Sequence, residues 1–230
     1  MKINIQNVTV EYSGRKVLDV ENLSFEQGKI YCILGLNGSG KSTLLNCIAG
    51  MLKYEGKIVY NGEDKIEDVR PQLSIMFQKP YMFNASVYEN IGCGLKFRKA
   101  DKETIERKIS EYESYFEIKD LMNKNAKSLS GGETSKVAML RCAVLETEVV
   151  LLDEPTASMD IESRIKAEEL IKSMASSKRT IIMITHDFYQ AERIADYIIF
   201  LDKGIVIEQG EKSIVLKNPE HPLVKALLNF

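Results

Sequence analysis

The sequence is poor in several features on which common protein classes depend. Its longest apolar runs, such as residues 198–201, fall far short of the roughly 20 residues that a helix needs to cross a bilayer, so no membrane span is expected. Only two histidines occur, His186 and His221, which excludes a histidine-rich metal site. The formal net charge is −2, and a chain so close to neutral has no general attraction for nucleic acid.

Cysteine is also scarce. The four cysteines, at positions 32, 47, 93 and 142, show no C-x-x-C spacing. Cys32 and Cys47 lie in apolar patterns, which favours buried free thiols in a reducing cytosol. Residues 1–6 lack the charged and then apolar build of a signal peptide, in keeping with that compartment. With 230 residues, 44% of them hydrophobic and 28% charged, the chain is expected to bury one full-sized core, or a core with a small subdomain.

The clearest motif is a glycine-rich stretch, residues 35–43, between an apolar run and a helical pattern. The run at 30–34 indicates a buried strand, and the apolar spacing after Thr43 indicates a helix. This context is the one that the phosphate-binding pattern G-x-x-x-x-G-K-[ST] requires. Glycines let several N–H groups point at one centre, the helix N-terminus favours negative charge, Lys41 can reach the β- and γ-phosphates, and the Ser42 hydroxyl can bind Mg²⁺. The predicted phosphate-binding residues are Gly35, Asn37, Gly38, Ser39, Gly40, Lys41, Ser42 and Thr43.

The amino-terminal part indicates strands. Residues 3–10 alternate as a strand does, and residues 23–25, the Gln27-Gly28 turn and residues 30–34 predict a hairpin that leads into the phosphate loop. Further strands are predicted at 57–60, closed by the Asn61-Gly62 turn, and at 73–77.

The pattern changes between Pro80 and Ser130, where an insertion of helices is predicted. Asp101 suits a helix N-cap, and the apolar residues after it share one helical face: Ile105, Ile109, Tyr112 and Phe116. Beyond the insertion, helices are predicted at 134–145, 161–175 and 222–228, strands at 149–152 and 181–185, and a hairpin over 197–208.

Three predicted strands end in polar residues: Gln78, the pair Asp153-Glu154, and His186. In an open parallel sheet, ligands bind at the carboxyl ends of the strands, so these residues should meet the phosphates held by the glycine-rich loop. Asp153 would then hold Mg²⁺, mostly through water, and Glu154 would orient and polarise the attacking water. Without the loop, a solvated strand end would be an equally good interpretation of Asp153-Glu154. A lone histidine is more often structural, but at the end of this strand His186 is a candidate contact to the γ-phosphate.

A second short motif, residues 129–133, precedes a predicted helix. Ser130 and Glu133 fit a capping box. The two glycines between them also expose N–H groups at a positive helix end, which is a second phosphate-binding geometry. One nucleotide cannot easily use two such sites from one small chain, so a second copy of the chain is expected to supply the other.

The order of these motifs resembles that of the ATP-binding-cassette (ABC) ATPase family over essentially the whole chain; they are residues 35–43, Gln78, 129–133, 149–154, 157–160 and His186. The resemblance implies an α/β fold: a P-loop NTPase core of the ABC type with an N-terminal antiparallel β-subdomain and an inserted α-helical subdomain. It further implies one domain over residues 1–230, with the core at 1–79 and 147–230 and the helical signature subdomain at 80–146.

The resemblance also assigns ligands and roles, with ATP and Mg²⁺ as cofactors. Tyr12 stacks on adenine, and Asp160 belongs to a loop that crosses the interface of a head-to-tail homodimer. Ser130, Gly131 and Gly132 bind the γ-phosphate of ATP held by the other subunit. The predicted catalytic residues are Glu154, His186 and Gln78, and the predicted metal-binding residues are Ser42, Gln78 and Asp153.

Two segments depart from the family pattern. Glu133 stands where glutamine is common, and Thr134-Ser135-Lys136 follows where a more basic, glutamine-rich run is usual. A glutamate near a triphosphate could slightly disfavour the closed dimer. The sequence at 157–159, Ala-Ser-Met, also departs from the commonest sequence of this loop in the family. Neither departure touches Lys41, Glu154 or His186, so ATP hydrolysis is still expected.

The segment at 86–98 resembles its counterpart in importer ATPases, closest to the oxyanion group of tungstate or molybdate type. Otherwise it is simply the first helix of the insertion, with Gly92 and Gly94 loosening its end. The alternatives are the ATPase of an exporter, and a soluble mechanochemical ATPase, which would normally show a long coiled coil, a second cassette or a basic surface. The expected partners are a second ATPase subunit, a membrane permease that contacts residues 81–95, and indirectly a solute-binding protein, at the cytoplasmic face of the membrane and without nucleic acid.

Overall fold

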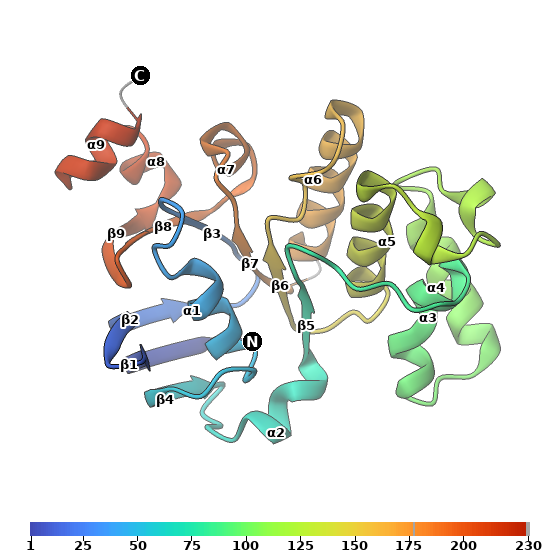
Figure 1. Ribbon diagram of the computed structural model, residues 1–230, viewed down its shortest axis with the longest axis horizontal. Helices are drawn as coiled ribbons and strands as arrows, with labels where there is room; N and C mark the ends of the chain where they lie inside the picture. The colour runs from blue at the N-terminus through green and yellow to red at the C-terminus, as the bar shows by residue number, and fades with distance from the viewer. Residues whose placement is uncertain (177, 229–230) are drawn as a thin grey trace.

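The computed structural model describes residues 1–176 and 178–228, and within them the strands form two sheets (Figure 1). The smaller sheet is antiparallel, in the order β2 (Arg15–Phe25), β1 (Ile3–Tyr12) and β4 (Glu55–Tyr60). The larger sheet has the order β5 (Leu73–Met76), β6 (Val149–Asp153), β7 (Thr180–Ile184), β3 (Ile30–Leu34), β8 (Tyr197–Asp202) and β9 (Ile205–Glu211).

The larger sheet is parallel except for its last strand, β9, which returns antiparallel to β8 as the predicted terminal hairpin. Every residue of β3, β6 and β7 is buried, as expected of apolar runs in a sheet that is covered on both faces. Because the strands run the same way, the carboxyl ends of β3, β5, β6 and β7 lie at one edge. The four segments with predicted chemistry all leave the sheet at this edge.

One predicted hairpin is wrong. Residues 23–25 do not pair with residues 30–34: Phe25 of β2 lies opposite Ile3 of β1, and β3 pairs with β7 and β8 in the other sheet. The turn at Gly28, with φ 74°, therefore passes the chain from one sheet to the other. The physical reason is that β3 is apolar on both faces and is stabilised only in the covered centre of the parallel sheet, whereas β2 has one exposed face.

Helices cover the two faces of the larger sheet and divide the interior into two cores. On one face, Leu44 of α1 (Lys41–Ile48) shares a core with residues of the smaller sheet, including Ile5 and Ile58. The other face carries α5 (Gly131–Ala143), α6 (Ile161–Ser176) and α7 (Phe188–Ile194). Short elements complete the described chain: α2 (Ile66–Val69), η1 (Arg70–Gln72), α8 (Lys212–Val215) and α9 (Pro222–Leu228).

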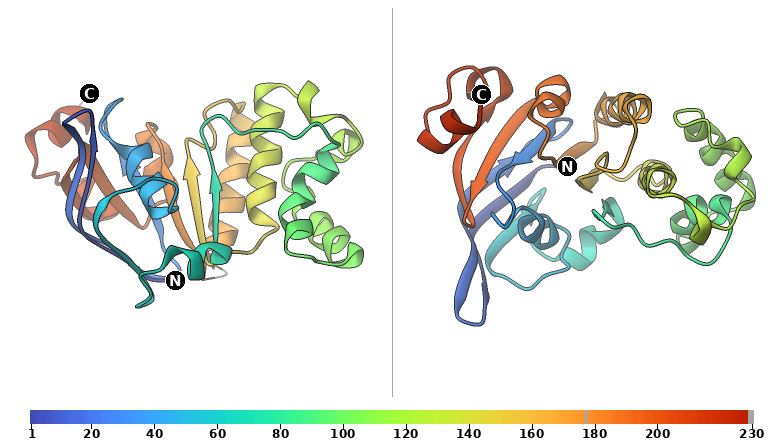
Figure 2. Two further views of the ribbon diagram at one scale, coloured as in Figure 1. Left: turned by 60° about the horizontal axis from the view of Figure 1, so that its bottom comes forward. Right: turned by 45° about the horizontal axis from the view of Figure 1, so that its top comes forward.

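The predicted helical insertion consists of α3 (Val87–Phe97), α4 (Lys102–Glu113), the short turns η2 (Lys119–Leu121) and η3 (Ala126–Ser128), and α5. Asp101 caps α4 as predicted, since its carboxylate accepts a 2.7 Å hydrogen bond from the N–H of Thr104. The helix ends at Glu113, so Phe116 is buried but does not extend the helical face as predicted. Figure 2 shows α3 and α4 beyond α5, on the side away from the sheets.

Gly92 and Gly94 do not loosen the end of α3, which continues to Phe97, so that expectation is wrong. Gly92 is buried, and a Cβ atom there would lie 2.9 Å from the side chain of Ile105 in α4. A Cβ atom at Gly94 would lie 2.8 Å from the side chain of Leu145. Both glycines therefore permit close packing of the helix. In the described part of the chain, no helix is long and apolar enough to span a membrane.

Candidate functional site

The glycine-rich loop joins β3 to α1 and has a backbone conformation that residues with side chains rarely adopt. Gly35, Gly38 and Gly40 have φ values of 145°, 78° and 100°. A Cβ atom on Gly35 would lie 2.1 Å from the carbonyl oxygen of Leu201, and one on Gly40 would lie 2.9 Å from that of Val17. The loop is thus held between neighbouring backbone segments, and α1 begins directly after it at Lys41. This gives the N–H groups at the start of α1 the orientation that binds anions.

Lys41 is nearly buried within this loop, at 7% exposure. Its Nζ atom donates hydrogen bonds to the carbonyl oxygens of Gly35 at 2.9 Å and Leu36 at 2.8 Å. Burial lowers the pKa of Lys41, while the nearby carboxylates of Glu154 and Asp153 act in the opposite direction. The ammonium group is therefore a fixed donor inside the loop, close to both acidic residues.

A cleft of about 460 Å³ lies in front of the loop. Its lining includes Tyr12 at the end of β1, the loop from Asn37 to Thr43, Gln78 after β5 and Glu154 after β6. Val17 and Ile184 also line it, and nothing in the sequence pattern singled them out. Tyr12 is 52% exposed, so about half of this residue is accessible beside the cleft. Residues predicted from four separate segments thus surround one cavity.

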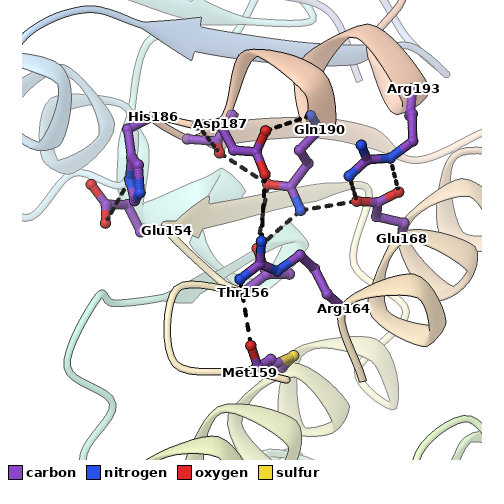
Figure 3. Close-up of polar contacts among 10 residues, drawn as sticks. Glu154, Thr156, Met159, Arg164, Glu168, His186, Asp187, Gln190 and Arg193 are labelled. Carbon is purple, nitrogen blue, oxygen red and sulfur yellow. Dashed lines mark hydrogen bonds and ion pairs between the residues drawn. The ribbon is translucent and has the colours of Figure 1, made fainter. Parts of the chain in front are cut away.

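The polar residues that follow β5, β6 and β7 meet at the carboxylate of Glu154. Gln78 donates from Nε2 to Glu154 Oε2 at 3.2 Å. His186 Nδ1 lies 3.4 Å from the same oxygen (Figure 3). The backbone N–H of Glu154 donates to the carbonyl oxygen of Ile184 at 3.0 Å. Two side chains from different strands therefore converge on one carboxylate beside the loop.

Asp153, the last residue of β6, lies next to the loop and is 8% exposed. Burial raises the pKa of Asp153, as does the Glu154 carboxylate, whereas the hydrogen bond from Ser42 and the charge of Lys41 lower it. The Ser42 hydroxyl and the Asp153 carboxylate are hard oxygen donors and are in contact, which fits Mg²⁺. The described residues contain no group of three or more His, Cys, Asp or Glu side chains placed to hold a metal. A phosphate-bound Mg²⁺ needs no such group, since one carboxylate, phosphate oxygens and water suffice.

Ser130 and Glu133 form the predicted capping box at the start of α5. Glu133 N–H donates to Ser130 Oγ at 3.3 Å, and Ser130 N–H donates to Glu133 Oε2 at 2.7 Å. The hydrogen bonds with Ser130 lower the pKa of Glu133, and Lys124 Nζ lies 3.9 Å from its carboxylate. Ser130, Gly131 and Gly132 do not line the cleft. The fold thus keeps this second glycine motif apart from the first within one chain.

The loop after Glu154 contacts the start of α5, a connection that the sequence did not suggest. The hydroxyl of Ser158 lies 2.7 Å from that of Ser135 and donates to the carbonyl oxygen of Gly131 at 3.2 Å. Asp160 caps α6 by accepting a hydrogen bond from the N–H of Ser163 at 2.8 Å. Segment 157–160 therefore connects Glu154, beside the cleft, with the second glycine motif at the start of α5.

Comparisons with known proteins agree with this arrangement. A family profile described as ABC transporter matches residues 18–157. The tungstate uptake system ATP-binding protein TupC of Peptoclostridium acidaminophilum is 44% identical over 210 residues, covering 90% of this chain and 98% of that protein. The molybdate/tungstate import ATP-binding protein WtpC of Methanocaldococcus jannaschii is 38% identical over 222 residues, covering 94% of this chain and 73% of that protein. The dimeric structure of MJ0796, a bacterial ABC transporter cassette, matches with a TM-score of 0.85 at 26% identity, over 91% of this chain and 98% of that chain.

Proposed function

The chain belongs to the ABC transporter ATPase family, and from that premise we propose that it is the ATP-hydrolysing subunit of an importer for oxyanions such as tungstate or molybdate. The observation that carries the proposal is the identity to the tungstate and molybdate/tungstate relatives along nearly the whole chain. The names of the two relatives describe uptake and import, which favours an importer over an exporter. The subunit works at the cytoplasmic face of the membrane, bound to a permease, with a solute-binding protein as an indirect partner.

In this proposal, ATP occupies the cleft in front of the glycine-rich loop. The adenine stacks on Tyr12, and the phosphates lie against the N–H groups of the loop from Gly35 to Thr43 and against Lys41. The cleft lining and the positive φ values of the loop glycines support these roles. Ser42, Asp153 and Gln78 hold Mg²⁺, directly or through water. The bound ion neutralises charge on the phosphate oxygens.

Hydrolysis is carried out at the carboxyl ends of β5, β6 and β7. Glu154 polarises the attacking water, Gln78 orients it, and His186 contacts the γ-phosphate. The convergence of Gln78 and His186 on Glu154 supports this division of roles. Phosphoryl transfer has a loose transition state, so positioning and charge neutralisation account for most of the rate.

The second half of each site comes from another copy of the chain. Ser130, Gly131 and Gly132 bind the γ-phosphate across a head-to-tail homodimer, and Asp160 belongs to the loop at that interface. Their separation from the cleft within one chain supports this. The N–H of Ser130 in the capping box and the nearby ammonium group of Lys124 partly offset the negative charge of Glu133. This reduces the repulsion between Glu133 and a triphosphate.

The permease is proposed to bind the helical subdomain, residues 80–146, which is inserted in the core formed by 1–79 and 147–230. A largely apolar groove of about 580 Å³ crosses this subdomain, lined by Phe83, Ala85, Tyr88, Glu89, Gly92, Cys93, Lys96, Phe97 and Ile105. Such a groove suits a short permease helix. Segment 80–95 follows Gln78, so a movement of Gln78 on loss of the γ-phosphate would reach the groove.

The importer assignment is tested by transport. Cells that lack this subunit should lose uptake of tungstate or molybdate, and the wild-type gene should restore it. A Glu154→Gln gene should fail to do so, since uptake requires hydrolysis. Restoration of efflux, with uptake unchanged, would contradict the importer assignment. Uptake of another solute would contradict only the assignment of an oxyanion as the transported solute.

The groove is tested by placing a charge in it. Tyr88→Asp should leave the ATPase activity of the isolated subunit intact, because Tyr88 lies outside the cleft, yet reduce co-purification with the permease and solute uptake together. Phe97→Asp is a second probe that cannot disturb the core, since Phe97 is 79% exposed. Ile214→Asp, at an exposed position on α8 far from the groove, is the matched control. Normal co-purification of both groove variants would place the contact elsewhere.

A further inference from the structure

Gln190 of α7 is fully buried, at 0% exposure, and its carboxamide bridges three other segments (Figure 3). Its Oε1 atom accepts a 2.9 Å hydrogen bond from the Thr185 hydroxyl. Its Nε2 atom donates to the Thr156 hydroxyl at 2.9 Å and to Glu168 Oε1 at 3.3 Å. No sequence motif pointed to this residue.

Glu168 of α6 fixes which way the carboxamide faces. A carboxylate accepts hydrogen bonds and donates none, so the amide nitrogen must point at Glu168 and the amide oxygen at Thr185. Glu168 is 6% exposed and is itself held by Arg193, which donates from Nε at 2.9 Å and from Nη2 at 2.6 Å. The carboxamide of Gln190 therefore has one orientation, and the ion pair between Glu168 and Arg193 stabilises it.

The two threonines belong to the segments that carry His186 and Glu154. Thr185 directly precedes His186, and its hydroxyl also accepts a hydrogen bond from the N–H of Asp187 at 3.1 Å. Thr156 follows Glu154 by two residues. Asp187 in turn caps α7 by accepting a 2.9 Å hydrogen bond from the N–H of Gln190. One side chain thus connects the backbone on either side of His186 to the backbone after Glu154.

The strand pairing between these segments ends at the hydrogen bond from the N–H of Glu154 to the carbonyl oxygen of Ile184, and close packing does not continue beyond it. A cavity of about 60 Å³ lies between them, and its lining includes Glu154, Thr156, Thr185 and His186. Interiors transmit position well only where atoms are in contact, so beyond the last backbone hydrogen bond the bridge through Gln190 is the direct connection between the two segments. The loop that leads to Asp160 is also held from this side, since Arg164 Nη1 lies 3.6 Å from Asp187 Oδ2 and its Nη2 donates to the carbonyl oxygen of Met159 at 3.5 Å.

We propose that Gln190 is a positioning residue for ATP hydrolysis: its carboxamide sets the distance between His186 and Glu154 without touching the nucleotide. The proposal rests on the proposed roles of these two residues. It requires that loss of the bridge lowers kcat and leaves ATP binding unchanged, because Lys41 and the glycine-rich loop are not part of the bridge.

The direct test is Gln190→Met, which keeps the length of the side chain and removes its donor and acceptor. A misplacement near 1 Å can cost about 100-fold in rate, so a fall in kcat of about 10-fold or more is expected, with the KM for ATP within about twofold of wild type. Unchanged kcat in a folded Gln190→Met subunit would overturn the proposal.

Two threonines, Thr180 and Thr185, separate an effect on positioning from an effect on stability. Both are buried, Thr180 as the first residue of β7 and Thr185 directly after its last residue, and each hydroxyl donates one hydrogen bond: Thr185 to Gln190, Thr180 to the carbonyl oxygen of Met1 at 2.7 Å. Thr185→Val and Thr180→Val should both lower the melting temperature, Thr185→Val somewhat more because its hydroxyl also accepts from the N–H of Asp187, but only Thr185→Val should lower kcat. Equal kcat in the two variants would overturn the proposal, and this pair carries the test if Gln190→Met does not fold.

Combining Gln190→Met with His186→Ala tests whether Gln190 acts through His186. If Gln190 acts by positioning His186 against Glu154, adding Gln190→Met to His186→Ala should change single-turnover hydrolysis by less than about twofold, since coupled residues are not additive. A full additive loss would contradict the proposal. Normal turnover of His186→Ala and Glu154→Gln alone would instead contradict their assigned roles, so the two failures can be told apart.

Discussion

Glu154 has a backbone conformation that side chains rarely adopt, with φ 48°. Such a residue costs on the order of 1 kcal/mol and persists only where its surroundings hold it. Here the N–H of Glu154 donates to the carbonyl oxygen of Ile184, and its carboxylate meets Gln78 and His186. The strain aims the carboxylate at the cleft instead of continuing the line of β6, which fits the proposed role in activating water.

Glu154→Gln tests this role. The amide keeps the shape of the side chain but cannot accept a proton, so ATP turnover should fall at least about 100-fold, the scale of losing a general base. ATP binding should persist, and the variant should dimerise in ATP and Mg²⁺, because the closed state can no longer hydrolyse its nucleotide. Turnover by phosphate release and dimerisation by size-exclusion chromatography are the measurements.

Lys41→Ala is the contrasting variant at the same site. In the proposed mechanism the Lys41 ammonium acts in the ground state as well as in the transition state, so its loss should weaken ATP binding itself. Near-normal turnover in Glu154→Gln would remove Glu154 from the role of base.

Single residues could be predicted where a motif joins a residue type to a place in the fold. Lys41, Asp153 and Glu154 follow apolar strand patterns, so both their chemistry and their location were readable. Gln190 and Ser158 were not, because their partners lie 5 to 34 and 23 to 27 positions away along the chain and depend on how helices pack around the sheet.

At the scale of elements, an ion-pair cluster fastens α4 to the amino end of β7. Glu146, after α5, pairs with Lys108 of α4 and lies 3.7 Å from Arg179 Nη2. Arg179 also donates to the Tyr112 hydroxyl at 2.9 Å and to the carbonyl oxygen of Ala143 at 3.3 Å. Burial disfavours the charged form of Glu146, but the hydrogen bond and charge of Lys108, together with Arg179, hold its pKa below the usual range.

Glu146→Gln should therefore destabilise the protein in a pH-dependent way. A carboxylate with a lowered pKa in the folded state stabilises it above the unfolded pKa of about 4.3, and this contribution is lost as pH falls through the folded pKa. The side chain is about a third exposed, so solvent screening limits the effect to about 1 kcal/mol at pH 7. Urea unfolding at pH 7 and near pH 3 should show the difference from wild type shrinking in acid.

Glu111→Gln, at an exposed position on α4, is the control for this measurement and should have little effect at either pH. An equal loss from Glu146→Gln at both pH values would mean that packing, not charge, accounts for the role of Glu146.

Elements were predictable where their own residues decide them. The apolar runs that became β3, β6 and β7 and the cap at Asp101 depend on local pattern, and both were right. The hairpin over residues 23–34 was wrong because β3 pairs with β7 and β8, which come much later in the chain, and local sequence does not reveal such distant partners. Gly92 was misread for a similar reason: its role depends on Ile105 of another helix.

At the scale of the whole molecule, the family and the α/β fold class predicted from the order of the motifs are confirmed. Parallel strands must place their carboxyl ends at one edge, so the order of motifs implied their convergence. The chain alone leaves the second glycine motif, 130–132, outside the cleft. A complete site in the proposed mechanism therefore needs two molecules, and this is the property that a mixing experiment can isolate.

Ser130→Arg should leave ATP binding to the monomer intact but block closure, since a large side chain then occupies the motif that faces the partner's nucleotide. Lys41→Ala should bind ATP poorly in its own cleft. Neither homodimer has a working site, yet a heterodimer of the two has one composite site with Lys41 from one chain and Ser130 from the other. At equal mixing, half of the dimers are mixed and each has one site of two, so about a quarter of wild-type turnover should return if one site suffices.

The control is a chain that carries both substitutions, mixed with Ser130→Arg. No pairing of these two chains restores an intact site, so turnover should stay at the background of the single variants, because exchange of subunits alone adds nothing. Turnover is measured as a function of total protein concentration and should rise with it in the first mixture, as dimerisation demands. Failure of the first mixture to recover, or a wild-type specific rate that does not depend on concentration down to the monomer, would mean that Ser130 and Lys41 act within one chain.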